Sequence, residues 1–251
     1  MNTRDELNDS FLLQDFESGD RISSELDRFK IFASGYARIE NAIAVLSDLR
    51  DRTSYIYYGR LGQLLGLCPD GEYCRIESIW EEDIFSCVPP KDLERKHLEE
   101  LKFIHFLRNS PKDCYSHYYL TSVLPMRGKD DSMHNVRHRV FYVSVEPNGS
   151  IRLALCLYNL MDDKTDRETY ICDSISGKVI SLEQQDFNGL LSKREKEILK
   201  LIDNGWSSKE ISANLSISIH TVNRHRQNIL SKLCVANSIE ACRTAKQLEL
   251  I

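Results

Sequence analysis

Apolar residues recur every three or four positions through the last sixty residues, which predicts four short amphipathic helices. The segments between the apolar stretches are only a few residues long. The predicted inward positions are, helix by helix, Ile198, Leu199 and Ile202; Ile211 and Leu215; Val222, Ile229, Leu230 and Leu233; and Ile239, Ala241, Ala245 and Leu248. The pattern predicts a small all-helical domain over residues 190–251.

Polar residues ahead of these stretches predict where the helices begin. Three pairs have the spacing of a capping box, in which a polar side chain bonds an amide of the first turn and an acid bonds back. The pairs are Ser192–Glu195, Ser207–Glu210 and Asn237–Glu240. Ser218 is a fourth cap candidate, and Gly205 can end the first helix because glycine enters the left-handed conformation without strain. Only Ser216-Ile217-Ser218 separates the second and third helices, which predicts a helix-turn-helix.

The third helix carries polar residues on the face opposite its apolar stripe. Asn223, Arg224 and Gln227 lie on that face. Arginine can bond guanine with two hydrogen bonds, and asparagine and glutamine can do the same with adenine. We therefore expect this face to enter a major groove. The alternative is an ordinary solvated helix face in a small bundle.

The segment from Leu191 onward resembles the DNA-binding domain of the LuxR/GerE family of bacterial transcription regulators. The resemblance covers about a quarter of the chain and rests on the motifs L-S-x-R-E-x-E-I-L, G-x-S-x-K-E-I, L-x-I-S and T-V-N-x-H-x-x-N-I, followed by K-L. It implies a four-helix domain whose third helix enters the major groove, and a homodimer on a partly palindromic site.

The same resemblance assigns roles to particular residues. It places Asn223, Arg224 and Gln227 at positions that touch bases. It places three further residues at positions that support or contact the phosphate backbone, namely Lys209, Thr221 and His225. Asn223 departs from the family, because many members have lysine there, so we expect a different base preference at that position.

The preceding residues alternate between helical and extended patterns. Residues 1–37 read as a helical segment, and residues 38–181 as a sensory domain with an antiparallel sheet. Its expected strands are 42–46, 54–58, 118–124, 139–145, 151–158, 169–171 and 179–181, and its expected helices are 62–67 and 92–108. The turn Glu146-Pro147-Asn148-Gly149 predicts a hairpin between two of these strands. The polar segment 182–189 reads as a linker.

Two strands, a helical middle and an antiparallel hairpin group resemble the PAS sensory fold, from about Arg38 to Asp163. The resemblance rests on the order of the elements, without diagnostic side chains. It implies a domain that senses a small molecule, or dimerises, and couples that event to an output domain. Flavin binding is disfavoured because no cysteine lies in an N-C-R-F-type motif. The predicted fold class is α+β: a PAS-like sheet with helices, followed by an all-α helix-turn-helix domain.

Charge is divided between the two halves. Leu191 to Ile251 contains ten lysines and arginines against six acids, a balance of +4, whereas the rest of the chain has a balance of −9. A mildly basic module on an acidic body indicates a nucleic-acid contact confined to the C-terminal part. The first thirty residues are acidic and lack a signal peptide, so we expect a cytoplasmic protein without a membrane partner.

Several clusters could suggest other chemistry. The eight cysteines form no C-x-x-C pair, which favours reduced thiols over a metal site. His134 and His138 read as part of a solvated strand edge rather than a metal pair. His97 and His105 could in principle bind haem, but a histidine on a half-buried helix is more often structural.

Tyr115, Tyr118 and Tyr119 could line a ligand pocket or simply pack the sheet. The chain has no Gly-rich phosphate loop, G-x-S-x-G elbow or H-E-x-x-H pair, so we do not expect an enzyme.

The sequence thus predicts a transcription regulator in which a PAS-like domain senses an unidentified small molecule or partner and controls DNA binding by a homodimer. RNA polymerase is a further candidate partner, and no cofactor is predicted. Two alternatives stay open: a PAS-like dimerisation module that binds no ligand, and a signalling enzyme with a DNA-binding tail. The sensed ligand, the operator and the choice between activation and repression are not encoded in these patterns.

Overall fold

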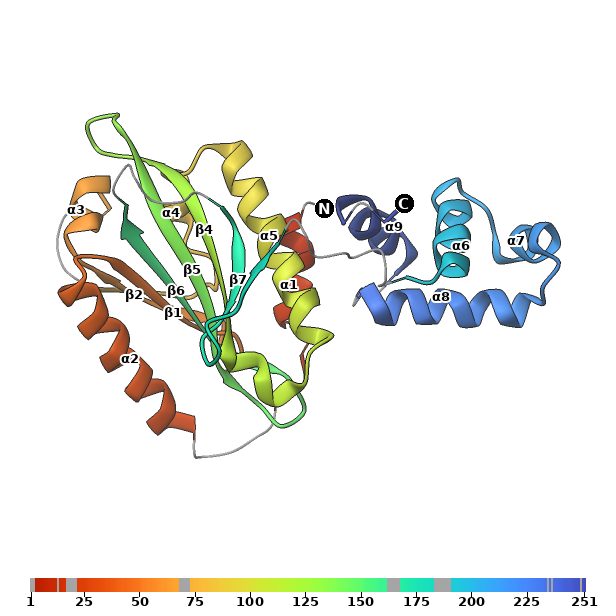
Figure 1. Cartoon of the computed structure of the whole chain (residues 1–251), viewed down its shortest axis with the longest axis horizontal. Helices are drawn as coiled ribbons and strands as arrows, with labels where there is room; N and C mark the ends of the chain where they lie inside the picture. The colour runs from red at the N-terminus through yellow and green to blue at the C-terminus, as the bar shows by residue number, and fades with distance from the viewer. Residues whose placement is uncertain are drawn as a thin grey trace. The chain divides into compact units, whose positions relative to one another are not determined.

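The structure is a computed structural model (Figure 1). It contains two units, one with the mixed helix and strand patterns and one with the purely helical pattern. It describes residues 3–12, 14–16, 22–67, 73–161, 168–182, 191–233, 235, 237–248 and 250–251. One unit is Phe11–Glu183, and the other combines Met1–Ser10 with Gln184–Ile251. The domain limits expected from the sequence stay predictions. Of the expected linker 182–189, only Leu182 lies within the described residues, and its side chain is buried.

The elements of the chain follow this order: α1 (Thr3–Leu12), α2 (Ile22–Ile39), β1 (Ile43–Asp48), β2 (Thr53–Tyr58), α3 (Arg60–Leu65), β3 (Tyr73–Ile76), α4 (Glu82–Ser86), α5 (Pro90–Arg108), the 3-10 helix η1 (Lys112–His117), β4 (Tyr118–Arg127), β5 (Met133–Val145), β6 (Ile151–Leu160), β7 (Tyr170–Asp173), β8 (Val179–Ser181), α6 (Lys193–Asp203), α7 (Ser208–Leu215), α8 (Ile219–Leu233) and α9 (Ser238–Gln247). All the strands and helices expected from the sequence are present, with most ends shifted by up to three residues and with β5 beginning six residues before the expected start. The sequence patterns did not predict β3, α4 or η1.

The strands form one antiparallel sheet in the order β3-β2-β1-β6-β5-β4-β7-β8. The predicted hairpin joins β5 and β6, and its turn contains Gly149 at φ +92°, a conformation that favours glycine. The first strand of the chain lies inside the sheet, because β1 pairs with β6 as well as with β2; Ile43 lies opposite Tyr158 in that pairing.

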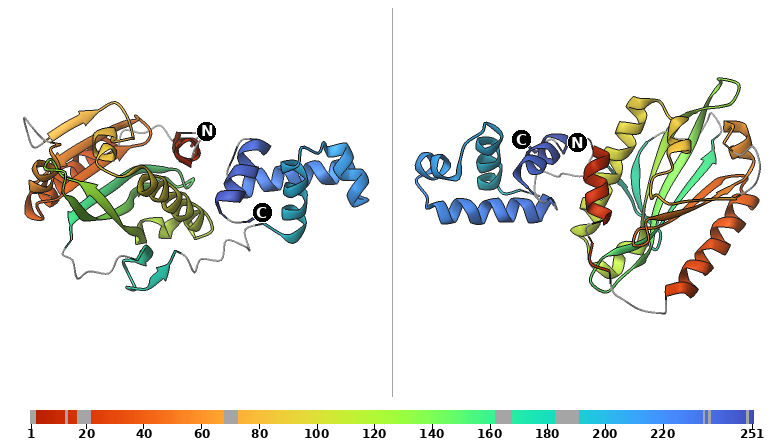
Figure 2. Two further views of the ribbon diagram at one scale, coloured as in Figure 1. Left: turned by 90° about the horizontal axis from the view of Figure 1, so that it is seen from above. Right: turned by 180° about the vertical axis from the view of Figure 1, so that it is seen from behind.

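Alternate residues of the central strands face two different layers. Ala44 and Leu46 of β1 pack with Ala33 and Ala37 of α2. Ile43 and Val45 of β1 face the other layer, which contains α3, α4 and α5. Figures 1 and 2 show α2 and α5 beside the sheet. Because β1 is covered on both faces, all its residues are buried, which explains its continuous apolar run.

The structure corrects one interpretation and refines another. His138 does not lie on a solvated strand edge: it is 1% exposed and faces α5 between Val136 and Val140. Among the three tyrosines, Tyr115 is buried, whereas Tyr118 and Tyr119 are half-buried. Tyr118 meets Phe106 edge to face, and Tyr119 stacks on Phe141. These contacts agree with a packing role.

No described helix combines the length and apolar character that crossing a bilayer requires. Among the described residues, no three histidine, cysteine or acidic side chains are placed to hold a metal ion.

Candidate DNA-binding interface

The four predicted cap residues all hold the first turns of their helices. Each side-chain oxygen accepts a hydrogen bond from the backbone amide three residues later. The cap residues Ser192, Ser207, Ser218 and Asn237 accept from the amides of Glu195, Glu210, Thr221 and Glu240 at 3.3, 3.4, 3.0 and 3.0 Å. The first two pairs form complete capping boxes. Since a cap contributes about 0.5–2 kcal/mol, the starts of the helices are encoded locally.

Two left-handed residues end the first two helices of this domain. Gly205 has φ +85°, and its amide donates to the carbonyl of Ile202, while Trp206 donates to Leu201. This is the Schellman arrangement, as the glycine predicted. Ser216 ends α7 with φ +52°, and the Ser212 hydroxyl donates to the carbonyl of Ile217 at 2.6 Å. The sharp turn between α7 and α8 is therefore confirmed.

The apolar stripe of α8 fixes the helix against the other three. Val222, Ile229 and Leu233 are at most 1% exposed and share one core cluster with Ile198 of α6 and Ala245 of α9. One predicted core residue is wrong: Ile239 is 81% exposed. The core also contains residues that the periodicity did not single out, namely Leu191, Cys242 and Leu250.

The opposite face of α8 is exposed and carries the predicted base-reading residues. Asn223, Arg224 and Gln227 are all exposed, with His220 beside them. The side chains of the first three form no hydrogen bond or ion pair with another residue in the described part of the chain. One helical turn separates Asn223 from Gln227, a rise of about 6 Å, which is close to two base-pair steps at about 3.4 Å. Their donors and acceptors are therefore free to contact neighbouring base pairs.

The three residues expected near the phosphate backbone differ in their surroundings. Lys209 is exposed at the start of α7. The Thr221 hydroxyl lies 2.8 Å from that of Ser218, so it supports the cap of α8. His225 is half-buried, and its Nδ1 is buried without a hydrogen-bond partner among the described residues. Contact with DNA stays a prediction for all six residues.

Arg226 has a structural role in this domain that the sequence analysis missed. Its Nη2 donates to the Ser238 hydroxyl at 2.9 Å, and its Nη1 donates to the Ser208 hydroxyl at 3.4 Å. It thereby ties α8 to the starts of α7 and α9. The helical period could have indicated this role. Residue 226 lies about 200° around the helix from Arg224, so it cannot share the exposed face of Arg224.

An ion pair between an exposed lysine and a buried glutamate ties the other end of α8 to α6. Lys232 Nζ lies 2.7 Å from Glu195 Oε2, and the same carboxylate accepts from the amide of Ser192 at 2.7 Å. Burial raises the pKa of Glu195, but the hydrogen bonds from Lys232 and Ser192 outweigh it and hold the pKa below its usual value. This carboxylate serves packing and capping.

Residues 189–245 match the sequence profile of the family described as "Bacterial regulatory proteins, luxR family". The C-terminal helices form a luxR-family DNA-binding domain. The match supports what the caps, the turn and the free face of α8 indicate for this luxR-type domain, and it leaves the first 188 residues uncovered.

Three curated relatives resemble part of the chain. The uncharacterized response regulatory protein YgeK of Escherichia coli is 42% identical over 77 residues, which are 31% of this chain and 48% of that protein. The transcriptional regulatory protein LiaR of Bacillus subtilis is 44% identical over 82 residues, or 31% of this chain and 39% of that protein. The oxygen regulatory protein NreC of Staphylococcus aureus is 30% identical over 106 residues, or 40% of this chain and 49% of that protein. The chain thus spans half or less of these relatives.

Solved structures give a broader but much looser likeness. A crystal structure of a phage VqmA–DPO complex covers 89% of this chain and 87% of its own, at 13% identity and a TM-score of 0.29. Escherichia coli SdiA covers 99% and 97%, at 15% identity and a TM-score of 0.26. At these values the likeness is too weak to support an inference about the N-terminal unit.

Proposed function

We propose that the protein is a transcription regulator that reads specific DNA sites with α8, and whose Phe11–Glu183 unit is a PAS-like sensor. The observation that carries the first part is the free, exposed set Asn223, Arg224 and Gln227 on a helix that is fixed on its other face. Phosphate contacts would supply much of the affinity, and these side chains the choice of site. As a regulator of transcription, the protein would act in the bacterial cytoplasm, with RNA polymerase as a further partner.

Selection of binding sites from random DNA by the full chain tests the reading function. The selected sites should share a partly palindromic sequence, and binding should weaken steeply with salt because each neutralised phosphate releases counterions. The balance of +4 over Leu191–Ile251 predicts a slope that corresponds to only a few phosphate contacts per subunit. A folded chain that retains no DNA at low salt would overturn the proposal.

The sensor assignment is supported by the order of elements in the sheet. Two strands (β1 and β2), a helical middle and three further strands (β4, β5 and β6) are the arrangement on which the resemblance to PAS domains rests. A small molecule that binds only the native state must raise the melting temperature. A dimerisation module without a ligand would show no such response, so the measurement separates the two interpretations.

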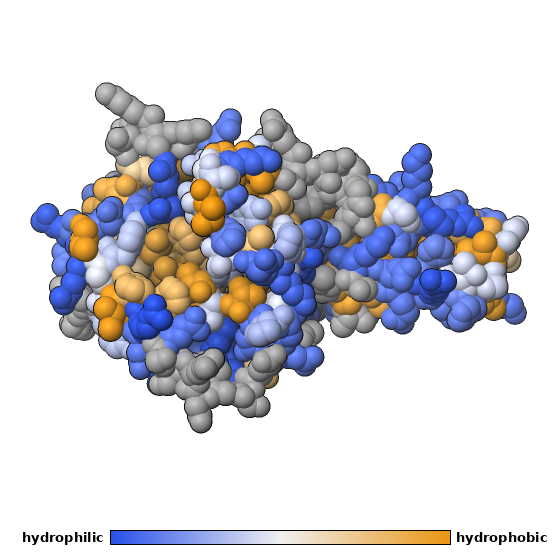
Figure 3. Space-filling view, turned by 60° about the horizontal axis from the view of Figure 1, so that its bottom comes forward, coloured by the Kyte–Doolittle hydropathy of each residue, from blue (hydrophilic) through white to orange (hydrophobic). Residues whose placement is uncertain are grey.

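We further propose that the regulator acts as a homodimer through an exposed stripe on α2. Ile31, Phe32 and Ile39 are 70%, 57% and 80% exposed, and Gly35 lies among them with nothing within 4 Å of the position of an added Cβ. In the view of Figure 3, apolar residues gather over the N-terminal unit, whereas the C-terminal unit is mostly hydrophilic. A twofold axis at Gly35 would bring Ile31 of an antiparallel copy against Ile39, and such self-complementarity is what a symmetric contact needs.

Sedimentation of the full chain tests this surface. Ile39→Asp should shift the chain from dimer to monomer, whereas Ile175→Asp, at a similarly exposed isoleucine (75%) in the turn between β7 and β8, should leave the dimer intact. A dimer that survives Ile39→Asp and Ile31→Asp would exclude the stripe as the interface.

A further inference from the structure

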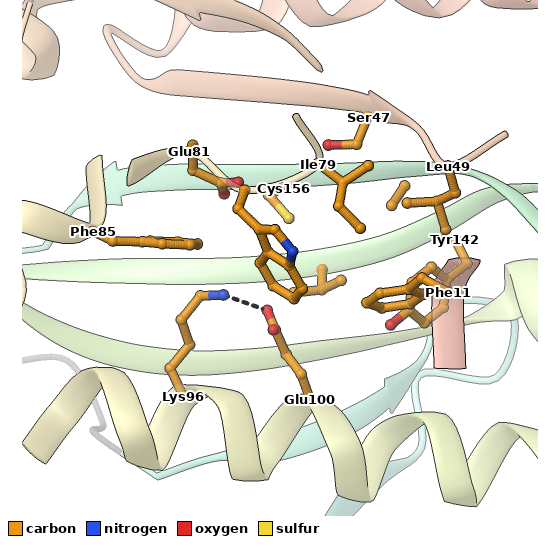
Figure 4. Close-up of a pocket in the computed structure, with 13 residues that line it drawn as sticks. Phe11, Ser47, Leu49, Ile79, Glu81, Phe85, Lys96, Glu100, Tyr142 and Cys156 are labelled. Atoms are coloured by element: carbon orange, nitrogen blue, oxygen red, sulfur yellow. Dashed lines mark hydrogen bonds and ion pairs between the residues drawn. The ribbon is translucent and has the colours of Figure 1, made fainter. Parts of the chain in front are cut away.

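A cavity lies on the inner face of the sheet of the N-terminal unit, between β5, β6 and α5. Its volume is about 30 Å³, which is room for water-sized molecules only. Figure 4 shows its two ends: Lys96 and Glu100 extend from α5 toward the sheet, Glu81 and Phe85 lie at one end, and Tyr142 and Phe11 lie at the other. All the lining residues belong to Phe11–Glu183.

Three ionisable side chains are buried together in this wall. Lys96, Glu81 and Glu100 are 2%, 4% and 4% exposed. The ammonium of Lys96 lies 2.8 Å from Glu100 Oε1 and 4.7 Å from the centre of the Phe85 ring. Burial lowers the pKa of Lys96, but Glu100 and Glu81 outweigh it and raise the pKa, so this side chain is an ammonium ion. One ammonium can balance only one of the two carboxyl groups in this wall.

Glu81 is the carboxylate with the weaker protein support. It accepts a hydrogen bond from the Tyr158 hydroxyl at 2.8 Å. Burial raises the pKa of Glu81 more than Lys96 and Tyr158 lower it. A set of apolar side chains of similar size would give a core at least as stable as a buried ionic cluster. Stability therefore does not account for these charges, and perturbed acids in a cleft are typical of functional sites.

Two buried side chains, one in the wall of the cavity and one outside it, have polar atoms without a hydrogen-bond partner among the described residues. The Tyr142 side chain is 1% exposed, lines the cavity and stacks on Phe103, but its hydroxyl has no hydrogen-bond partner among the described residues. Outside the lining, both ring nitrogens of His138 also lack a hydrogen-bond partner among the described residues, and its Nε2 lies 3.9 Å from Glu100 Oε1. Buried polar groups are normally satisfied, and the Tyr142 hydroxyl can take a partner only from the side of the cavity that it lines.

Aromatic rings close the cavity. The ring of Phe11 lies 6.4 Å from that of Trp80 and 6.1 Å from that of Tyr142, and Trp80 lies 6.4 Å from Phe85. Phe11 is in the last turn of α1, and Trp80 is in the segment between β3 and α4. A ligand larger than water requires these two side chains to rotate out of the cavity. Ring faces attract cations.

We propose that this cavity binds a small organic cation with a single aromatic ring, held by Glu81 and Glu100 through its charged group and by Phe11, Trp80 and Phe85 through its ring. The hydroxyl oxygen of Tyr142 accepts a hydrogen bond from the ligand, and Lys96 keeps Glu100 in place. This assignment rests on the proposed sensor function and names the class of ligand that the sensor takes.

Three probes with the same ring but different charge test the proposal on the full chain: benzylamine, benzyl alcohol and benzoate, by calorimetry and thermal shift. Benzylamine should bind best and benzoate worst.

Glu81→Gln should weaken the binding of benzylamine at least about tenfold, because a charge-assisted hydrogen bond is lost. Glu99→Gln is the matched control on α5, since Glu99 is buried but pairs with Arg95 outside the cavity, and it should leave binding unchanged. Tyr142→Phe should weaken benzylamine without lowering stability.

The Phe11→Ala variant tests whether the ring of Phe11 blocks entry of the probes into the cavity. The same order of preference in this variant supports the site and identifies Phe11 as its closure. If neither protein binds any probe, or if benzoate binds as well as benzylamine, the cavity holds water only and the proposal is wrong. DNA binding is measured on the same samples. If the chain binds DNA but no probe, the proposed ligand class is wrong and the DNA-binding function stands. If the chain binds a probe but no DNA, the DNA-binding function is wrong and the ligand site stands.

Discussion

Arg224 and Arg226 lie two residues apart on α8, and their surroundings predict opposite effects of the same substitution. Arg224 is exposed on the face with Asn223 and Gln227, whereas Arg226 is half-buried and donates to Ser238 and Ser208. Replacing each arginine by alanine therefore separates the reading of DNA from the packing of the domain, with helix, residue type and charge change held constant.

The magnitudes follow from these contacts. Arg224→Ala should change the free energy of unfolding by less than about 0.5 kcal/mol, as exposed substitutions do. It should weaken binding to the selected site by about 1–3 kcal/mol and relax the preference at one base pair. Arg226→Ala removes one hydrogen bond at 2.9 Å and one at 3.4 Å. A hydrogen bond to a charged group is worth about 1.5–3 kcal/mol, and partial exposure reduces this to about 1–2 kcal/mol.

Hydrogen exchange of the α8 amides in the full chain measures the packing effect. Exchange should accelerate about 5–30-fold in Arg226→Ala and stay near that of the parent chain in Arg224→Ala. Binding to selected and scrambled DNA measures the reading effect: Arg224→Ala should lose mainly the selected site, and Arg226→Ala both alike. The reasoning is refuted if Arg224→Ala accelerates exchange as much as Arg226→Ala, or if it weakens both DNAs equally.

Three further predictions concern stability and domain limits. Ile229→Ala should lower the free energy of unfolding by about 2–5 kcal/mol, because a 1% exposed side chain leaves a cavity; urea unfolding checks this, and an unchanged midpoint would contradict the burial. The lowered pKa of Glu195 means that its contribution is complete above about pH 4.3 and is lost as the pH falls through the folded-state pKa. Melting from pH 7 to 3 should show a smaller acid loss in Glu195→Gln. Limited proteolysis should cut first within residues 182–189, and a first cut within 38–163 would show that the linker is misplaced.

The DNA-binding domain could be predicted closely because its signals are local. A cap and its partner lie three residues apart, and a glycine at the end of a helix needs only its own φ. The error at Ile239 came from neglecting the helical period. Ala241, Ala245 and Leu248 share one face, and residue 239 lies about 200° from Ala241, so the wheel itself excludes it from the core.

The sheet could be predicted only as a set of strands, because its pairing is not local. β1 pairs with β6, more than a hundred residues later, and no turn signal links them. β3 and α4 are four and five residues long, too short for a periodic pattern. His138 was misread because charged residues flank its strand, yet the alternation of Val136, His138, Val140 and Tyr142 already places it on an inward face.

Two buried glutamates show why local sequence cannot assign such residues a role. Glu195 and Glu81 are 3% and 4% exposed, so desolvation penalises the charge of both. Around Glu195, the ammonium of Lys232 and the amide of Ser192 supply enough positive charge to lower the pKa. Around Glu81, Lys96 and the Tyr158 hydroxyl do not, and the pKa is raised. The first carboxylate is satisfied by its own chain, and the second lacks the countercharge that a cationic ligand would bring.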